Sequence, residues 1–324
     1  QITNGDGDPI ADSSEEVKMA VCEDTLIAVL PGGVLKEVPK KEFVYNGTKR
    51  ARRDEKIFAD KTIDRVKTIW PFSQSADKIV ISREGTAWHL LAEVSAEEFL
   101  QADEWEECRR ALAAGGLMIP CEKDADSLIC GAQNGDIVRL PADKLCAWQG
   151  QRQVVRIGEA PLAAACFCKE ADDILLISEK GQALRTHVSY LYKRVDIGGG
   201  LTKGMQMKKN TDDRLCCCLV YRPKRSLTAV SQQRKLLVLR VDSEEKAQLR
   251  AQGHVGEGVC LVHVEGSDRL AEVLYTDQAV LLLSDSGYAQ CRDVSVLREK
   301  GRRAKGIEGM KRGQIIRAVC AKVK

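Results

Sequence analysis

The chain has 324 residues, of which 44% are hydrophobic and only 5% aromatic, and its formal net charge is +3. This composition provides a large aliphatic core, and any preference for a charged partner must depend on where the charges lie, because their sum is small. No apolar run approaches the roughly 18 residues that a membrane span requires. The polar residues 1–16, which begin with Gln1 instead of Met, are expected to form a linker in a fragment of a larger protein.

One unit recurs six times along the chain: an aliphatic strand, a tight turn, a second strand and a base near its end. The first unit reads TLIAVLPGGVLKEV and the fourth DDILLISEKGQALRTHV. Five turns contain glycine, which readily adopts the positive φ of tight hairpin turns, and in the fifth unit we place a lysine there. The turn residues, roughly fifty residues apart as in repeat proteins, are Gly33, Gly85, Gly135, Gly181, Lys235 and Gly287.

Each hairpin is followed by a polar, often basic loop and a further short strand, such as RLCCCLVY or RLAEVLY. Four short strands per unit of about fifty residues are typical of a propeller blade, and six blades can close into a ring without free sheet edges. The predicted fold class is therefore all-β, as one six-bladed ring over residues 17–324; two unrelated β domains are the alternative. The predicted blades span approximately residues 17–72, 73–122, 123–170, 171–222, 223–274 and 275–324.

One short helical insertion is predicted in blade two, within SAEEFLQADEWEECRRALAAGG. Ser95 and Glu98 form a capping box at its start, and Gly115 and Gly116 end it. Residues 92–107 contain seven carboxylates and no base. The insertion either faces a partner or packs on its own blade.

The thirteen cysteines follow no disulfide or metal-binding pattern. None forms a CxxC pair, Cys216, Cys217 and Cys218 are consecutive, and only four histidines are present. We therefore expect free, mostly buried thiols in a reducing cytoplasm and no metal site.

Two stretches resemble the C-terminal domain of the A subunits of the bacterial type IIA topoisomerases, DNA gyrase and topoisomerase IV. They are ILLISEKGQALRTHVSYL followed by GGGLTKGMQMK, and VLLLSDSGYAQCRDVSVL followed by GRRAKGIEGMKRGQIIRAV. The resemblance covers residues 17–324. It implies a six-bladed β-pinwheel that binds and bends duplex DNA on its outer rim without sequence preference, and presents a DNA segment to the cleavage core.

The same resemblance implies that the catalytic tyrosine and the ATPase lie outside this chain, so that the domain is not an enzyme on its own and uses no cofactor. The implied partners are duplex DNA, the ATPase subunit and the rest of the A subunit, with the isolated domain monomeric and the protein cytoplasmic at the bacterial nucleoid. Gyrase carries a Gln-Arg-Arg-Gly-Gly box in its first blade, whereas YNGTKRARRDEK here lacks the paired glycines. This difference favours a topoisomerase IV-type subunit or a divergent gyrase with weaker wrapping.

Lysines and arginines gather in four loops, where they would contact DNA phosphates. The basic blades four, five, six and one are neighbours in a closed ring, so we expect DNA to follow that arc and to avoid the acidic blade two. Nearby glycines allow backbone N–H groups to approach phosphates. The predicted DNA-binding residues are Lys49, Arg50, Arg52, Arg53, Arg185, Lys193, Arg194, Lys203, Lys208, Lys209, Arg222, Lys224, Arg225, Arg298, Lys300, Arg302, Arg303 and Lys305, with Gly198, Gly199, Gly200, Gly204, Gly301 and Gly306 as the glycines.

Independent catalysis is not indicated, because GGGLTKG lacks the spacing of a phosphate-binding Walker loop and no histidine lies in a known nucleophile motif. The alternative function is a protein-interaction β-propeller without a DNA role. Salt-dependent retention on DNA would distinguish the two.

Overall fold

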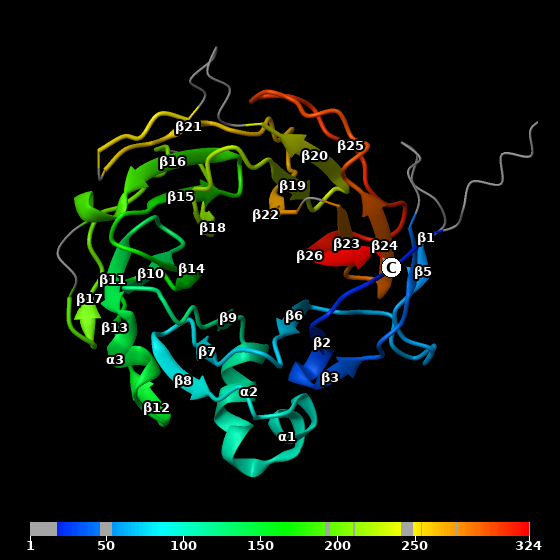
Figure 1. Ribbon diagram of the computed structural model, residues 1–324, viewed down its shortest axis with the longest axis horizontal. Coiled ribbons are helices and arrows are strands. Elements are labelled where there is room, and N and C mark those ends of the chain that lie inside the picture. Colours follow the sequence, from blue (N-terminus) through cyan, green and yellow to red (C-terminus); the bar gives the residue numbers. More distant parts are fainter. Residues whose placement is uncertain are drawn as a thin grey trace, which may run out of the picture.

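The computed structural model describes residues 18–45, 54–191, 195–209, 211–240, 249–253, 255–276 and 278–323. Six small antiparallel sheets stand around a central opening as the blades of a ring (Figure 1). Three strands of one repeat build most of each blade: the first is central, the second lies on its outer side, and the third pairs back on its inner side. The strands are β2 Thr25–Val29, β3 Leu35–Val38 and β6 Thr68–Phe72 in blade one; β7 Lys78–Ile81, β8 Thr86–Leu90 and β9 Leu117–Pro120 in blade two; β10 Ser127–Ala132, β11 Ile137–Pro141 and β14 Leu162–Cys168 in blade three; β15 Asp173–Ser178, β16 Gln182–His187 and β18 Leu215–Val220 in blade four; β19 Leu227–Ser231, β20 Lys235–Leu239 and β22 Leu270–Tyr275 in blade five; and β23 Ala279–Ser284, β24 Tyr288–Asp293 and β26 Ile315–Val323 in blade six.

The core consists of six apolar clusters, each between two neighbouring blades, and together they cover every junction around the ring. The central strands bury both faces, which explains why they are continuous aliphatic runs. In β7, Ile79 and Ile81 pack toward blade three while Val80 packs toward blade one. No blade has a core of its own, so the ring folds as one unit.

The hairpin turns have the geometry that the repeat predicted. Gly85 has a φ of 89° and Gly287 a φ of 70°. In the fifth unit, however, the positive φ of 71° belongs to Arg234, so the prediction of Lys235 at this position was wrong by one residue. Ser231 lies three residues before Arg234, and its hydroxyl accepts a hydrogen bond from the Lys235 amide at 3.1 Å. Equivalent serines precede the turn glycines of blades two, four and six.

The fourth strand of a blade is supplied by the following repeat. β12 (Gly150–Gln153) pairs with β8 of blade two, and β25 (Ile307–Glu308) pairs with β20 of blade five. In blade three the contact is a bridge between Ile137 and Thr202. The remaining short strands are β5 Glu55–Lys56 on blade six, β21 Val259–Cys260 on blade four, and β13 Val155–Arg156, which pairs in parallel with β17 Gly199–Gly200.

These exchanged segments also contact one another and form a second layer outside the blades, which we call the outer belt: residues 54–57, 150–156, 195–209, 252–253, 255–260 and 298–308. Besides the β13–β17 pair, Met205 bridges Gly256, and the Arg303 amide donates to the Leu261 carbonyl at 3.1 Å. The belt continues to blade six, where the Lys311 amide donates to Asp54 at 3.0 Å. It therefore runs from blade two to blade six.

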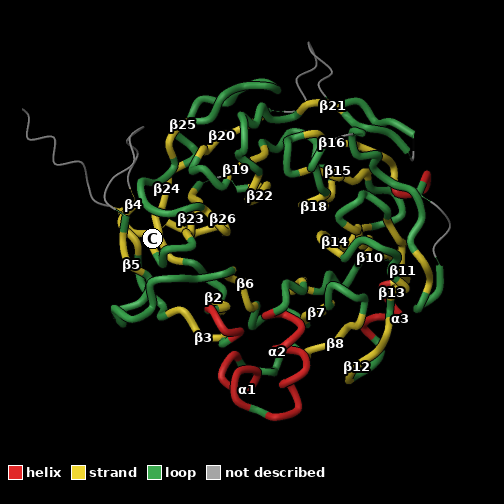
Figure 2. Tube along the Cα trace, turned by 180° about the vertical axis from the view of Figure 1, so that it is seen from behind, coloured by secondary structure: helices red, strands yellow, loops and turns green. Residues whose placement is uncertain are grey.

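Blade one is the exception. The following repeat places helices against β3 instead of a strand: α1 (Ala96–Gln101), the 3-10 turn η2 (Asp103–Trp105) and α2 (Glu106–Ala113). Within the described ranges no strand pairs with the outer edge of β3. Ser95 accepts a hydrogen bond from the Glu98 amide at 3.1 Å, which confirms the predicted cap. The helices project beyond the ring of strands (Figures 1 and 2).

The first and last strands close the ring. β1 (Lys18–Val21) pairs with β26 and with β4 (Phe43–Tyr45), so the blade-six sheet has six strands. Arg317 of blade six forms an ion pair with Glu272 of blade five at 3.1 Å and lies over the Trp70 ring of blade one at 4.2 Å from the ring centre. Burial raises the pKa of Glu272, and Arg317 opposes this shift. The remaining elements are the 3-10 turns η1 Pro31–Gly33 and η3 Val188–Tyr190 and the helix α3 Ala142–Cys146. The sequence did not predict α3.

None of the described helices is long and apolar enough to cross a membrane.

Candidate nucleic-acid interface

Strand exchange decides where each loop lies, because the outer loop of every repeat crosses the preceding blade. The segment 195–209 therefore lies over blade three, and the segment 298–308 over blade five. The acidic insertion of the second repeat lies over blade one. The bases predicted in the outer loops of repeats four and six therefore lie over blades three and five, one blade before the positions that the predicted arc over blades four, five, six and one assigned to them.

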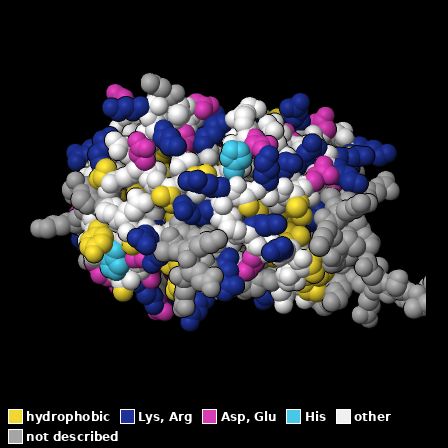
Figure 3. Space-filling view, turned by 90° about the horizontal axis from the view of Figure 1, so that it is seen from above, with side chains coloured by type: hydrophobic (Ala, Val, Ile, Leu, Met, Phe, Trp, Pro, Cys, Tyr) yellow, Lys and Arg dark blue, Asp and Glu magenta, His cyan; other side chains and the backbone are white. Residues whose placement is uncertain are grey.

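The edge of blade five has the highest density of bases among the described belt segments. Arg298, Lys300 and Arg303 are exposed, and a hydrogen bond between the Lys300 amide and the Val238 carbonyl at 2.9 Å fixes this segment against β20. Glu299 is the one acid between Arg298 and Lys305. Figure 3, which looks onto the upper edge of the ring of Figure 1, shows Lys and Arg side chains spread across this surface.

Two further bases of this loop have partners within the protein. The Arg302 guanidinium donates to the Cys260 carbonyl at 3.4 Å, which links the blade-five and blade-four belt segments. Lys305 pairs with Glu265 at 2.6 Å. The hydrogen bond between them raises the pKa of Lys305 and lowers that of Glu265, so both groups are charged near neutral pH. Since both side chains are exposed, water screens this pair strongly.

On the edge of blade three, Lys203, Lys208 and Lys209 are exposed. Lys203 lies 3.2 Å from Asp136, while Lys208 and Lys209 follow the point where the belt passes the Gly135 turn. This loop also has an acid, Asp196, which pairs with Lys144 at 2.8 Å; the hydrogen bond from Lys144 lowers the pKa of Asp196.

The glycines of the belt have two different roles. A side chain at Gly198 would meet open space, and one at Gly200 would only reach the tip of Arg156. The Gly198 amide nevertheless donates to the Val154 carbonyl at 2.8 Å, so this amide is already occupied within the protein. In contrast, a Cβ at Gly204 would overlap the Gly135 carbonyl, and one at Gly306 would overlap the Leu236 carbonyl. Close packing on the preceding blade therefore explains these last two glycines. Of the other predicted glycines, Gly301 is exposed in the belt, whereas a Cβ at Gly199 would overlap Val195.

Arg185 does not join the rim bases. Its Nε donates to Asp173 at 2.7 Å, one terminal nitrogen donates to the Leu249 carbonyl at 2.9 Å, and the guanidinium stacks on Tyr221 at 3.7 Å from the ring centre. Its side chain is only 24% exposed. This arginine fixes the start of the blade-four belt segment to β16.

A second group of predicted bases lies away from the outer edge. Arg222, Lys224 and Arg225 belong to the turn between β18, the inner strand of blade four, and β19, the central strand of blade five. Arg222 and Lys224 are exposed on a face of the ring, and Arg225 lies over Tyr275 at 5.3 Å from the ring centre. The remaining predicted bases Lys49, Arg50, Arg52, Arg53, Lys193 and Arg194 lie outside the described residues.

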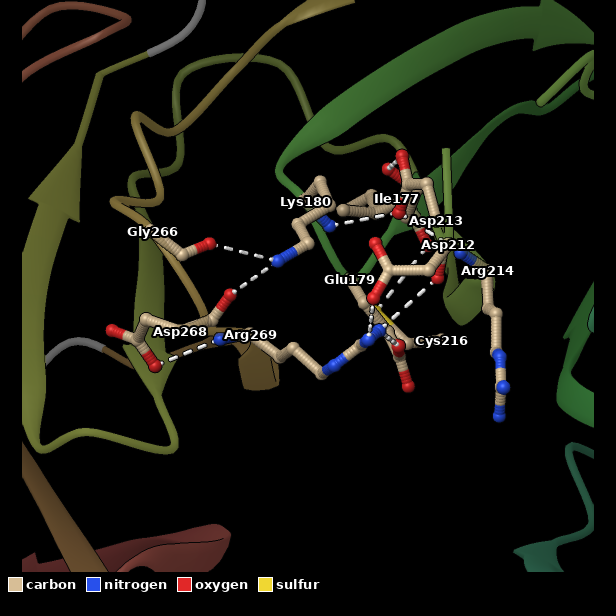
Figure 4. A network of polar contacts seen from close by, with 11 residues as sticks. Ile177, Glu179, Lys180, Asp212, Asp213, Arg214, Cys216, Gly266, Asp268 and Arg269 are labelled. Carbon is tan, nitrogen blue, oxygen red and sulfur yellow. Dashed lines mark hydrogen bonds and ion pairs between the residues drawn. The ribbon is translucent and has the colours of Figure 1, made fainter. Parts of the chain in front are cut away.

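Several bases near the rim are structural. Lys180 donates to the carbonyls of Gly266 and Asp268, both at 3.1 Å, and Arg269 pairs with Glu179 and Asp212 (Figure 4). This network fixes the blade-four turn to blade five. Loop charge alone therefore overstates the number of cations that are available to a ligand.

Sequence reasoning missed the bases on the edge of blade two. Arg152 of β12 and Arg156 of β13 are exposed and belong to the third repeat, outside the four loops in which bases were predicted. The signal was the polar run GQRQ, whose four residues are all exposed on the belt.

A closed ring of six blades with exchanged outer strands is a six-bladed β-pinwheel. Two solved structures share this fold: a DNA gyrase A C-terminal domain (TM-score 0.73, 15% identity, 91% of this chain and 99% of that chain) and the C-terminal domain of a DNA topoisomerase IV (TM-score 0.58, 13% identity, 92% and 93%).

In sequence, the chain is 26% identical over 203 residues to the DNA gyrase A protein of Mycolicibacterium smegmatis, a match that covers 60% of this chain. The match spans about 23% of the length of that relative. No family model matches the chain. The resemblance to the C-terminal domains of type IIA topoisomerase A subunits, which the repeat motifs indicated, is confirmed.

Proposed function

We propose that this chain is a DNA-binding domain from the A subunit of a type IIA topoisomerase, and that it holds duplex DNA along the outer belt over blades three to six. The observation that carries the proposal is the convergence of exposed bases from separate repeats onto one continuous belt. Arg298, Lys300 and Arg303 lie on blade five, and Lys203 and Lys208 lie on blade three, at least 90 positions earlier in the sequence.

Such a surface suits binding without sequence preference. Lysine and arginine side chains contact phosphates, and no element of the belt is shaped to read base edges. Bending a site of 20–30 base pairs through 40–90° costs on the order of 1–6 kcal/mol, which several neutralised phosphates can offset. The curved edge of the ring would therefore bend the DNA that follows it.

The chain corresponds to about 23% of the gyrase A relative, so we place DNA cleavage and ATP hydrolysis in other parts of a larger assembly. The domain would act as a monomeric, non-catalytic unit that presents a DNA segment to the rest of the A subunit, with a further partner in the ATPase subunit, at the bacterial nucleoid. The first-repeat loop YNGTKRARRDEK lacks paired glycines, which favours a topoisomerase IV-type or divergent gyrase function with bending in place of complete wrapping.

The test compares two pairs of bases. In Arg298→Glu/Lys300→Glu the reversed charges lie on the belt, whereas in Arg222→Glu/Lys224→Glu they lie on the face of the ring. Both variants change the net charge equally. Fluorescence anisotropy with a labelled duplex, measured over a salt series, should show a loss of about tenfold or more for the belt pair and a smaller loss for the face pair.

Equal losses for the two pairs would show that only net charge matters and would contradict the assignment of DNA to the belt. Salt-independent or absent DNA binding by the unmodified chain would instead favour a protein-interaction ring.

A further inference from the structure

The helical insertion interrupts the outer belt at one position. On blades two to six the belt passes the hairpin turn: the Val154 amide donates to the Gly85 carbonyl at 2.9 Å, and the Ile57 amide donates to the Gly287 carbonyl at 3.0 Å. The equivalent turn of blade one, at Gly33, faces Ala113 of α2. A hollow of 580 Å³ remains between this turn and the helix. The two ends of the belt, on blades two and six, are therefore separated by α1 and α2.

The insertion also reverses the charge of the rim. Glu97, Glu98 and Glu104 are exposed on α1 and η2. The arginines of α2 do not neutralise them: Arg110 pairs with Glu106, and Arg109 donates to the Phe99 and Ala102 carbonyls at 2.7 and 2.8 Å. A phosphate backbone that continued past blade six along the edge of blade one would approach these carboxylates, whose repulsion acts over a screening length of roughly 10 Å at 0.1 M salt.

Shape has the same effect as charge. α1 and α2 stand outside the ring of strands, whereas the belt on the other blades follows its edge (Figures 1 and 2). A duplex that lies on the belt would have to leave the edge to pass them. Both effects occur at the same place, although each is independent of the other.

We infer that the acidic helical insertion, which lies between the edges of blades one and two, is a stop that ends the DNA track on blade one, so that DNA follows an open arc and does not encircle the ring. This inference rests on the proposed DNA binding to the belt. It assigns the insertion a regulatory role, because its charge sets the length of DNA that the domain holds. The stop acts by repulsion, and no ligand is needed at the insertion itself.

Charge reversal on α1 tests the inference. Glu97→Lys/Glu98→Lys places cations beside the end of the belt. The matched control is Glu122→Lys/Asp124→Lys, which makes the same change in net charge in an exposed turn between β9 and β10, away from the outer belt. The measurement is hydroxyl-radical footprinting of the 324-residue chain on a linear duplex of about 150 base pairs, one persistence length.

We expect the α1 variant to lengthen the protected segment about 1.25-fold, since five blade edges become available in place of four and phosphate contacts position the DNA. The control variant should bind DNA more tightly without a longer footprint. An α1 footprint equal to that of the unmodified chain, or an equal lengthening in both variants, would overturn the inference. If the unmodified chain protects no DNA, the proposed function itself fails, and this outcome is distinct from the other two.

A second variant separates the effect of charge on the footprint from any effect of a less stable α1. In Glu97→Gln/Glu98→Gln the capping box is retained, because glutamine replaces glutamate at its third helical position. The glutamine variant should also lengthen the footprint, but by less than the lysine variant does. A shorter footprint would also overturn the inference.

Discussion

Blade three and blade one begin with the same hairpin and differ in what lies on its outer edge. Gly135 and Gly33 have nearly equal φ angles, 87° and 83°. The blade-three turn is covered by the belt at Met205, whereas the blade-one turn faces Ala113 of the insertion. The hairpin therefore builds the ring, and the segment received from the next repeat determines what the edge presents: lysines on blade three and carboxylates on blade one.

The largest expected effect is on the free energy of unfolding, and it concerns the hairpin turns at Gly135 and Gly33. Gly135→Ala should destabilise the protein by about 3 kcal/mol, because left-handed strain adds to an overlap of the new Cβ with the Met205 carbonyl. Gly33→Ala has the same strain, but the nearest atom to its Cβ lies at 3.6 Å, so the expected loss is about 1 kcal/mol. Urea unfolding measures both. Equal losses would show that the belt does not press on the blade-three turn.

The next effect concerns the charge that each edge presents. Lys208→Glu/Lys209→Glu should weaken duplex binding about tenfold at 0.1 M salt and reduce the slope of log affinity against log salt by about 1.8, or 0.9 for each lost phosphate contact. Anisotropy titrations at several salt concentrations provide both values. An unchanged slope would mean that these lysines do not contact phosphate, and the belt would then end before residue 208.

The smallest effect is local and tests how the belt begins on blade two. A hydrogen bond from Cys121 lowers the pKa of Cys146 to about 7, whereas burial raises the pKa of Cys291 to about 12. Thiolate is the reactive form, so alkylation of Cys146 by iodoacetamide should accelerate as pH rises through about 7 and should precede that of Cys291. Mass spectrometry of peptides after short exposures provides the rates.

In Cys121→Ala the donor is removed, so the pH at which Cys146 reacts at half its maximal rate should rise. An unchanged pH profile would show that Cys121 does not hold this end of α3, which leads into β12.

The sequence predicted the parts of this fold that depend on local chemistry. Turn glycines, aliphatic central strands and the Ser95 cap all act within a few residues of one another, and the structure has each of them. Arg234 was missed because a non-glycine residue at positive φ has no strong sequence signal. In four of the six blades a serine precedes the turn residue by three positions, Ser231 in this case, and this spacing would have corrected the register.

Strand exchange could not be predicted, because it joins residues that are remote in sequence through very short contacts. Gly199 and Gly200 form a strand of two residues, and Thr202 makes a single bridge; neither has a strand-like sequence pattern. For this reason the charged loops of repeats four and six were assigned to their own blades, although they lie over the preceding ones. The pairing of Arg185 with Asp173 likewise depends on a neighbouring strand, which loop charge does not reveal.

Photocrosslinking tests the central claim, that DNA follows the belt and stops at the insertion, most directly. A benzophenone side chain would be introduced singly at Lys300 on blade five, at Lys209 beyond the blade-three turn and at Glu97 on α1, all exposed positions. After irradiation with a labelled duplex at 0.1 M salt, we expect strong crosslinks from positions 300 and 209 and almost none from position 97. A crosslink at position 97 as efficient as that at position 300 would contradict the account.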